Sequence, residues 1–407
     1  MQTRFDSSAK ALPRTLEADR ILRSCVHCGL CNATCPTYQL LGDELDGPRG
    51  RIYLIKQMLE GGVVTATTQT HLDRCLTCRS CETTCPSGVK YHSLLDIGRE
   101  EIARRVPRPL AQRMMRGALR RVMTRPRLFA SVLRIGQSLR FLIPTKWRGK
   151  IPLRAQNTRP WPTAAHARKV LMLEGCVQRT LAPNTNSAAA RVLDRLGIQV
   201  QYASAARCCG AVDYHLDAQA AGLKSARRNI DAWWPMIEAG AEAIVQTASG
   251  CGTFIKDYGH LLRDDGRYAE KAQRVSAMAL DLVEIVRREP LELLRLAVNS
   301  NQSIAVHTPC TLHHGQRLDG AIEAMLKRLG FQILPVPDAH LCCGSAGTYS
   351  LTQPVLATQL RDNKITALQS GGAQQIVTAN IGCQIHLGAA ASVPVRHWIE
   401  LLDEALR

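Results

Sequence analysis

Two runs of closely spaced cysteines near the beginning of the chain have residue types and spacing suited to binding metal. Each run has the form C-x2-C-x2-C-x3-C-P. This spacing lets three thiolates from one turn bind three irons of a cubane, while the fourth thiolate, redirected by the proline, reaches the other cluster. We therefore predict two [4Fe-4S] clusters with crossed ligands. The first set is Cys25, Cys28, Cys31 and Cys85, and the second is Cys75, Cys78, Cys81 and Cys35.

Structural zinc sites are the alternative interpretation of these runs, because they also use C-x2-C units. Zinc needs only four ligands in a tetrahedron, and it explains neither the third close cysteine nor the Cys-Pro pair in each run. Two clusters with crossed ligands must lie close together, as in an electron relay. The spacing therefore predicts one-electron transfer, without its direction.

Length and cysteine content exclude several classes of protein. The chain has 407 residues and 16 cysteines, with no charged and then apolar leader, so we do not expect a short secreted disulfide scaffold. We expect a cytoplasmic protein with reduced thiols. No apolar stretch is long enough for a membrane span. The longest uncharged stretch, residues 365–395, is interrupted by glycine and polar residues, and we expect a buried strand and loops there.

The net charge of +18 comes from one segment of the chain. Residues 102–173 contain eighteen Lys and Arg and no Asp or Glu. Within it, one face of a predicted helix carries the apolar residues Leu128, Val132, Ile135, Leu139 and Leu142. Such a basic helix with an apolar face could bind anionic lipid headgroups. It could equally bind an acidic partner surface, or it could be a solvated connector between domains.

The pattern of residues divides the chain into four parts. Residues 1–107 form a predicted helical, ferredoxin-like domain with helices at 49–60 and 94–105, and residues 108–165 form a basic helical connector. From residue 166 short β-rich runs at 170–173, 200–203 and 243–247 alternate with helical stretches, which indicates an α/β structure. We therefore predict an α+β and α/β protein.

The second half of the chain is an internal duplication, with predicted repeats at residues 166–295 and 296–407. In each repeat a cysteine precedes a Cys-Cys-Gly triplet by 32 residues, and a Gly-Cys pair follows a β-like run. The cysteines are Cys176, Cys208, Cys209 and Cys251 in the first repeat and Cys310, Cys342, Cys343 and Cys383 in the second.

This duplicated pattern resembles the cysteine-rich CCG domain of heterodisulfide reductases, of the C subunit of anaerobic glycerol-3-phosphate dehydrogenase and of lactate-utilisation proteins. Together with the block CVHCGLCNATCPTYQLLGDELDGPRGRIYLIKQMLEG, it makes nearly the whole chain similar to the iron-sulfur subunits of bacterial glycolate oxidase.

Both repeats depart from the fullest form of the CCG family, which has a fifth cysteine in a final C-x2-C. Phe254 and His386 stand at the fifth positions. The four remaining cysteines of a repeat could hold a further iron-sulfur cluster, to which His386 could add an imidazole. Alternatively, they are buried small apolar residues. His307, His313 and His314 lie near Cys310, but histidines are more often surface or satisfied core residues, so we assign them no role.

The resemblance implies a subunit of a membrane-associated complex that oxidises glycolate, and that could also accept D-lactate, with electrons passing towards quinone. The chain has no G-x-G-x-x-G after a strand and no phosphate loop, so we expect FAD in partner flavoprotein subunits and no catalytic residue in this chain. The expected location is the cytoplasmic face of the inner membrane, as a peripheral subunit.

Three other functions compete with this one. The chain could be a heterodisulfide-reductase-like subunit or a glycerol-3-phosphate dehydrogenase C-type subunit. A nucleic-acid-binding iron-sulfur protein would fit the pI near 9.5, but only 4% of residues are aromatic and few of them lie among the basic residues. We therefore expect no nucleic-acid partner.

Overall fold

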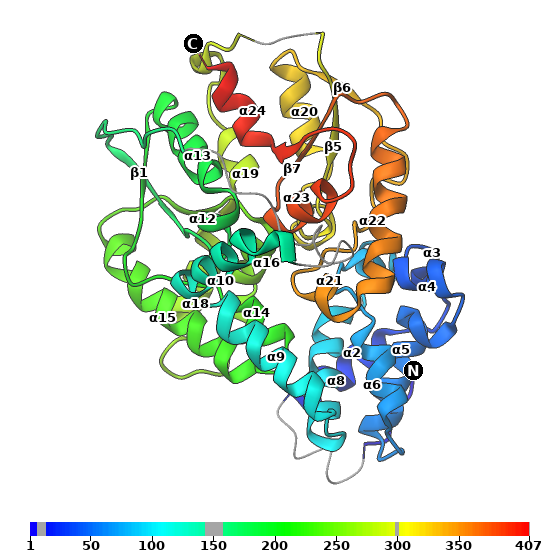
Figure 1. The fold of residues 1–407 in the computed structure, drawn as a ribbon. Coiled ribbons are helices and arrows are strands. Elements are labelled where there is room, and N and C mark those ends of the chain that lie inside the picture. Colours follow the sequence, from blue (N-terminus) through cyan, green and yellow to red (C-terminus); the bar gives the residue numbers. More distant parts are fainter. Residues whose placement is uncertain (6–13, 143–157, 298–300, 407) are drawn as a thin grey trace. The chain divides into compact units, whose positions relative to one another are not determined.

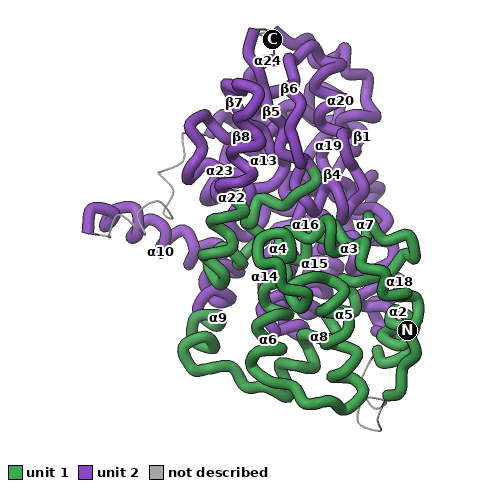
Figure 2. Tube along the Cα trace, turned by 90° about the vertical axis from the view of Figure 1, so that its right-hand side faces the viewer, with its two compact units in different colours: residues 1–117, 340–361 green, residues 118–339, 362–407 purple. Residues whose placement is uncertain are grey.

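The computed structural model describes residues 1–407 except 6–13, 143–157, 298–300 and 407 (Figure 1). The chain forms two compact units, which Figure 2 shows in different colours. Unit 1 contains residues 1–117 and 340–361, and unit 2 contains residues 118–339 and 362–407. The limits of the four domains predicted from the sequence stay predictions.

Unit 1 is helical. Its helices are α2 (Thr15–Ser24), α3 (Leu30–Ala33), α4 (Pro36–Leu41), η1 (Glu44–Asp46), α5 (Pro48–Leu59), α6 (Ala66–Asp73), α7 (Ser80–Thr84), α8 (Tyr91–Arg105) and α21 (Tyr349–Thr352). Two further helices begin in unit 1 and end in unit 2. They are α9 (Leu110–Met123) and α22 (Pro354–Gln369).

The core of unit 1 lies between the helices that follow the two cysteine runs. Leu22, Ile55, Leu72 and Leu94 are fully buried in it. The predicted helices at 49–60 and 94–105 are α5 and α8, and α8 begins three residues earlier than expected. Burial of their apolar faces thus holds the two runs on one small scaffold.

The described residues of unit 2 form eight strands in two parallel sheets. The strands are β1 (Arg168–Met172), β2 (Ile198–Gln201), β3 (Ala243–Gln246), β4 (Ala279–Asp281), β5 (Ser303–His307), β6 (Gln332–Leu334), β7 (Gln375–Thr378) and β8 (Val395–His397). Their orders are β2-β1-β3-β4 and β6-β5-β7-β8, and all pairings are parallel. The two orders correspond strand by strand, as a duplication requires.

Helices connect the strands of unit 2, as parallel pairing demands. Besides α21 and α22, those between β1 and β8 are α12 (Gln178–Leu181), α13 (Pro183–Arg195), α14 (Ala211–His215), α15 (Gln219–Glu238), α16 (Ser249–Lys256), α17 (Tyr258–Leu261), α18 (Ala269–Met278), α19 (Leu282–Val286), η3 (Leu291–Leu294), η4 (Thr311–Gly315), α20 (Ala321–Arg328) and α23 (Ile381–Gly388). The helices α10 (Pro126–Ser138) and η2 (Arg140–Leu142) precede β1, and α24 (Trp398–Ala405) follows β8. The mixed helical and α/β fold class predicted from the sequence is confirmed.

The two repeats of unit 2 share one apolar core. Val170, Val245, Ile304, Val377 and Trp398 all belong to it. Polar contacts also join the repeats, since the hydroxyls of Ser249 and Thr311 lie 2.7 Å apart. The repeats therefore stabilise one another.

The prediction of a strand and loops for residues 365–395 was incomplete. The stretch contains the end of α22, strand β7 and the helix α23. Glycine and polar residues concealed this helix, but one of them starts it, because the Asn380 side chain accepts a hydrogen bond from Gly382 N at the N-cap.

Candidate iron-sulfur sites

The first cysteine run surrounds a cavity in unit 1. Cys25, Cys28, Cys31 and Cys85 all line it, and Cys81 does as well. Burial raises the pKa of Cys25 and that of Cys31, the latter to about 11, and the neighbouring Cys85 raises both further. Iron binds the thiolate and displaces these protons, and thiolate is the ligand that iron-sulfur clusters prefer. The donor set therefore fits a [4Fe-4S] cluster.

The backbone of the two runs turns in the same way, which explains how the thiols converge. His27 and Gly29 have positive φ angles of 61° and 88°, and Thr77 and Arg79, at the matching positions of the second run, have φ of 55° and 62°. This left-handed conformation is costly for residues other than glycine. Its repetition indicates that the cysteine geometry requires it.

The second run is more deeply buried than the first. Cys75, Cys78 and Cys81 are buried, and so is Cys35 from the first run. Burial raises the pKa of Cys81 well above its usual value, and Cys78, Cys75 and Cys35 each add to the rise. The structure thus brings Cys35 close to the second run and Cys85 close to the first. The crossed ligand sets themselves stay a prediction.

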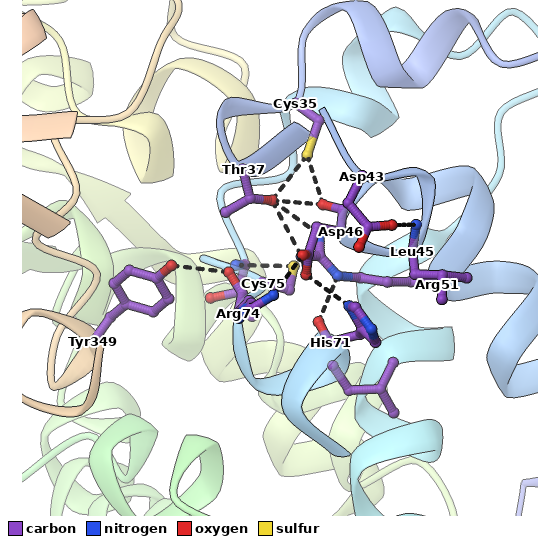
Figure 3. Close-up of polar contacts among 12 residues, drawn as sticks. Cys35, Thr37, Asp43, Leu45, Asp46, Arg51, His71, Arg74, Cys75 and Tyr349 are labelled. Carbon is purple, nitrogen blue, oxygen red and sulfur yellow. Dashed lines mark hydrogen bonds and ion pairs between the residues drawn. The ribbon is translucent and has the colours of Figure 1, made fainter. Parts of the chain in front are cut away.

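A buried network of charged residues lies beside Cys35 and Cys75 (Figure 3). Asp46 is fully buried, and its carboxylate accepts hydrogen bonds from Arg51 Nη2 at 3.4 Å and Arg74 Nη1 at 2.7 Å. His71 Nδ1 lies 3.0 Å from the same carboxylate. One buried carboxylate thus faces two guanidinium groups, of which that of Arg51 is buried and that of Arg74 is partly exposed.

Hydroxyl groups connect this network to the sulfur atoms. Thr37 Oγ1 accepts hydrogen bonds from Arg51 and lies 3.3 Å from Cys35 Sγ. The Tyr91 hydroxyl donates to Cys75 Sγ at 3.6 Å. Hydrogen bonds to the sulfurs and nearby charge tune the potential of a cluster. The burial of Arg51 and Asp46 could not be predicted from the sequence, because charged residues are usually exposed.

The first cysteine-rich repeat brings its four cysteines together in unit 2. Cys209 Sγ and Cys251 Sγ lie 3.5 Å apart. Hydrogen bonds from Cys176 and Cys209 lower the pKa of Cys208, which places a third and a fourth sulfur at the same site. Asn229 binds the loop that holds the Cys-Cys pair, since Asn229 Nδ2 donates to Cys208 O at 3.0 Å and Arg207 N donates to the Asn229 side chain at 2.9 Å.

The fifth position of the first repeat belongs to the apolar core. Phe254 is buried, and its ring packs against those of Tyr214, His215 and Tyr258. The first repeat therefore presents four thiols and replaces the fifth ligand by an aromatic cluster.

The cysteines of the second repeat belong to both units. Cys310 and Cys383 lie in unit 2, and Cys342 and Cys343 lie in the segment 340–361 of unit 1. Gly344 N donates to Cys342 Sγ at 3.4 Å, so the Cys-Cys-Gly turn is tight.

The basic connector has the exposed apolar face predicted for it. Helices α9 and α10 have no buried residue. Val132, Ile135 and Leu142 are 46%, 60% and 68% exposed. Among the described residues, no helix is both long enough and apolar enough to cross a membrane.

Comparisons with known proteins agree with this arrangement of sites. Residues 21–89 match a 4Fe-4S dicluster domain, and residues 170–256 and 304–388 each match the cysteine-rich domain CCG. The chain is 62% identical over 406 residues to the glycolate oxidase iron-sulfur subunit of Escherichia coli, covering 100% of this chain and 99% of the relative. The chain belongs to the family of glycolate oxidase iron-sulfur subunits.

Two more distant relatives are also similar. A probable glycolate oxidase iron-sulfur subunit of Bacillus subtilis is 29% identical, with 94% of each chain covered. Lactate utilization protein A of Bacillus licheniformis is 28% identical over 58% of this chain and 99% of the relative. The resemblance to glycolate oxidase iron-sulfur subunits seen in the sequence is therefore confirmed, as are the iron-sulfur cofactors expected from it.

Proposed function

We propose that this chain is the electron-transfer subunit of a complex that oxidises glycolate to glyoxylate, with D-lactate as a further substrate. The proposal is carried by the combination of two close cysteine sets in unit 1 with full-length similarity to a glycolate oxidase iron-sulfur subunit. Clusters of this kind carry one electron at a time. Removing two electrons from a hydroxy acid therefore needs a two-electron cofactor, and we place a flavin in partner subunits for this step.

The residues of this chain have three roles in that transfer. The eight N-terminal cysteines hold the clusters in the crossed sets, and the buried thiols exclude water from them. Arg51, Thr37 and Tyr91 adjust the charge and hydrogen bonding around the second set. The cysteines of the CCG repeats hold a further centre that extends the relay.

The test is reduction of the clusters by substrate in the assembled complex. The chain is purified anaerobically with its flavoprotein subunits, and the reduced-cluster signal is followed by electron paramagnetic resonance after adding glycolate, D-lactate or glycerol 3-phosphate. We expect glycolate to reduce the clusters. Reduction by glycerol 3-phosphate alone would contradict the proposal, and disulfide reduction by the isolated chain would favour a heterodisulfide-reductase-like role.

We further propose that helix α10 and η2 place this peripheral subunit on the inner membrane, where electrons leave towards quinone. The support is an exposed apolar face next to Arg125, Arg127 and Arg134, in a segment of the chain without acidic residues. Each basic residue near an anionic surface contributes about 1 kcal/mol of attraction.

Flotation with lipid vesicles tests this contact. We expect the full chain to bind vesicles that contain anionic lipid and to bind weakly to zwitterionic ones. Substituting Arg125, Arg127 and Arg134 by Gln should lower binding more than tenfold. A matched triple substitution of Arg263 and Arg267, which lie between α17 and α18, and of Arg274 on α18 should not. Equal binding by both variants would contradict membrane contact.

A further inference from the structure

His307 is a buried histidine that the protein leaves without polar partners. It is the last residue of β5, and its side chain is 2% exposed. Among the described residues, neither Nδ1 nor Nε2 has a hydrogen-bond partner. An unpaired buried polar group costs about 1 to 3 kcal/mol. Native proteins usually retain such a group where an ion or a water completes it.

A cysteine thiol lies beside the unpaired imidazole. A ring nitrogen of His307 and Cys383 Sγ are within 4.8 Å of each other, and both side chains are buried. Strands β5 and β7 are parallel neighbours, with His307 paired to Thr378, and Cys383 lies in the first turn of the helix that follows β7. Both ligand atoms therefore lie at the carboxyl ends of adjacent parallel strands, which is where such sheets bind ligands.

Two further features mark the same edge of the sheet. Thr378 is fully buried, and its hydroxyl also lacks a partner among the residues that the structure describes. Cys310 follows His307 by three positions and precedes η4, which is a π-helix over Thr311–Gly315. Short π-helical turns are rare and occur frequently at functional sites.

The first repeat provides an internal comparison. Three residues before Cys176 it has Leu173, which is buried in an apolar cluster, where the second repeat has His307 before Cys310. A leucine would fill the position in the second repeat without an unpaired polar group. Packing alone would therefore favour leucine over histidine at this position. A ligand bound to the imidazole would explain the histidine.

We propose that His307 is an imidazole ligand of an iron-sulfur centre in the second cysteine-rich repeat, bound together with Cys383. The inference rests on the proposed function, in which the CCG half extends the relay. Cys310, Cys342 and Cys343 remain ligands predicted from the sequence spacing.

The chemistry of the imidazole suits this role. Burial favours the uncharged form of an imidazole, and the neutral ring has a lone pair for a metal. A neutral imidazole in place of a thiolate makes a centre less negative and raises its reduction potential, so the centre accepts electrons more readily.

The test counts iron and measures potentials in the anaerobically purified full chain. We expect about eight irons from the N-terminal clusters plus additional iron in the wild type. His307→Leu, which installs the residue of the first repeat, and Cys383→Ser should both lose the additional iron. His307→Cys should retain it and lower the potential of that centre. His386→Leu tests the other candidate imidazole of this repeat and should keep the iron.

Several outcomes would overturn the inference. They are additional iron that is unchanged in His307→Leu, loss of iron in His386→Leu but not in His307→Leu, or zinc in place of iron at the site. Signals of the two N-terminal clusters should persist in every variant, so failure here is distinguishable from failure of the proposed function. Thermal melting of the metal-free protein serves as the folding control, because His307→Leu should then melt at the same or a higher temperature.

Discussion

The hydroxyl of Tyr349 donates a hydrogen bond to the backbone oxygen of Arg74, over 3.0 Å, within unit 1. Arg74 directly precedes Cys75 of the second cysteine run, and Tyr349 follows the Cys342-Cys343 pair by six residues. A segment of the second CCG repeat is thus bonded to the turn that leads into a ferredoxin-like run (Figure 3). Burial raises the pKa of Tyr349, and nearby Cys75 raises it further, so the phenol stays protonated as a donor.

We expect Tyr349→Phe to weaken this connection. The substitution leaves the Arg74 oxygen without its donor, so the free energy of unfolding should fall by about 1 kcal/mol. Denaturant unfolding of the metal-free chain measures this change. Tyr53→Phe, at a 44% exposed position, is the control and should have no effect. Equal stability of both variants would show that the hydrogen bond is unimportant.

Arg51 should control the potential of one cluster. Its guanidinium is buried and near both Cys35 and Cys75. Arg51→Gln removes a positive charge there, so the reduction potential of the cluster on the second set should fall while the other potential changes less. An electron paramagnetic resonance titration measures both values. Arg49→Gln, at a more exposed arginine near the first set, is the comparison. If Arg49→Gln changes the reduction potential of the second cluster more than Arg51→Gln does, the prediction is wrong.

The same Arg51 substitution should reduce stability. Removal of one partner from a buried ion pair costs about 3 to 5 kcal/mol in general. Because Asp46 keeps Arg74 and His71, we expect a loss near the lower limit. Arg51→Lys should recover part of it, since it restores the charge but not the separate hydrogen bonds of the guanidinium to Thr37 and to the backbone oxygen of His71. Urea unfolding of the metal-free chains tests this order of stability.

Serine substitutions should separate the crossed ligand sets. Cys85→Ser should alter the same cluster signal as Cys28→Ser, and Cys35→Ser the same signal as Cys78→Ser. Spectra of the four anaerobically purified variants decide the question. If Cys35→Ser instead shares the signal change of Cys28→Ser, the ligands of each cluster come from a single run.

Acid should destabilise unit 2 through His397. This residue is buried, with Nε2 2.8 Å from Thr247 O and Nδ1 accepting from Ile399 N. Burial lowers its pKa to about 4, and the bond to Thr247 O offsets this only in part. The unfolded chain, with a pKa near 6.5, binds a proton that the folded chain does not. Stability is therefore complete above pH of about 6.5 and declines towards pH 4, by up to about 1.4 kcal/mol per pH unit.

His397→Gln should flatten this decline. The substitution removes the titrating group, although it lowers stability at neutral pH by disturbing two hydrogen bonds. Thermal melting between pH 4 and 7 compares the slopes. His166→Gln is the control, because His166 is more exposed and pairs with Asp194 at the surface. An unchanged slope in His397→Gln would assign the acid sensitivity to other groups.

The sequence alone determined which chemistry the chain carries. Cysteine spacing is a local property, and it predicted the two runs, the duplication and the iron-sulfur cofactors that the domain matches confirm. Periodic apolar residues such as Ile52 and Ile55 likewise predicted α5, because an amphipathic helix repeats its apolar residues every three or four positions. The helix α23 escaped detection, since its start depends on a cap at Asn380 rather than on a hydrophobic pattern.

Only the tertiary structure decided what surrounds the cysteines. The charge beside Cys75 comes from Asp46, Arg51 and Arg74, and the unpaired imidazole beside Cys383 comes from His307. Burial, hydrogen bonding and pKa depend on groups that are distant in the chain and near in space. Spacing along the sequence therefore identifies the cysteines that can bind iron, whereas the fold decides which charges, hydroxyls and imidazole act on them.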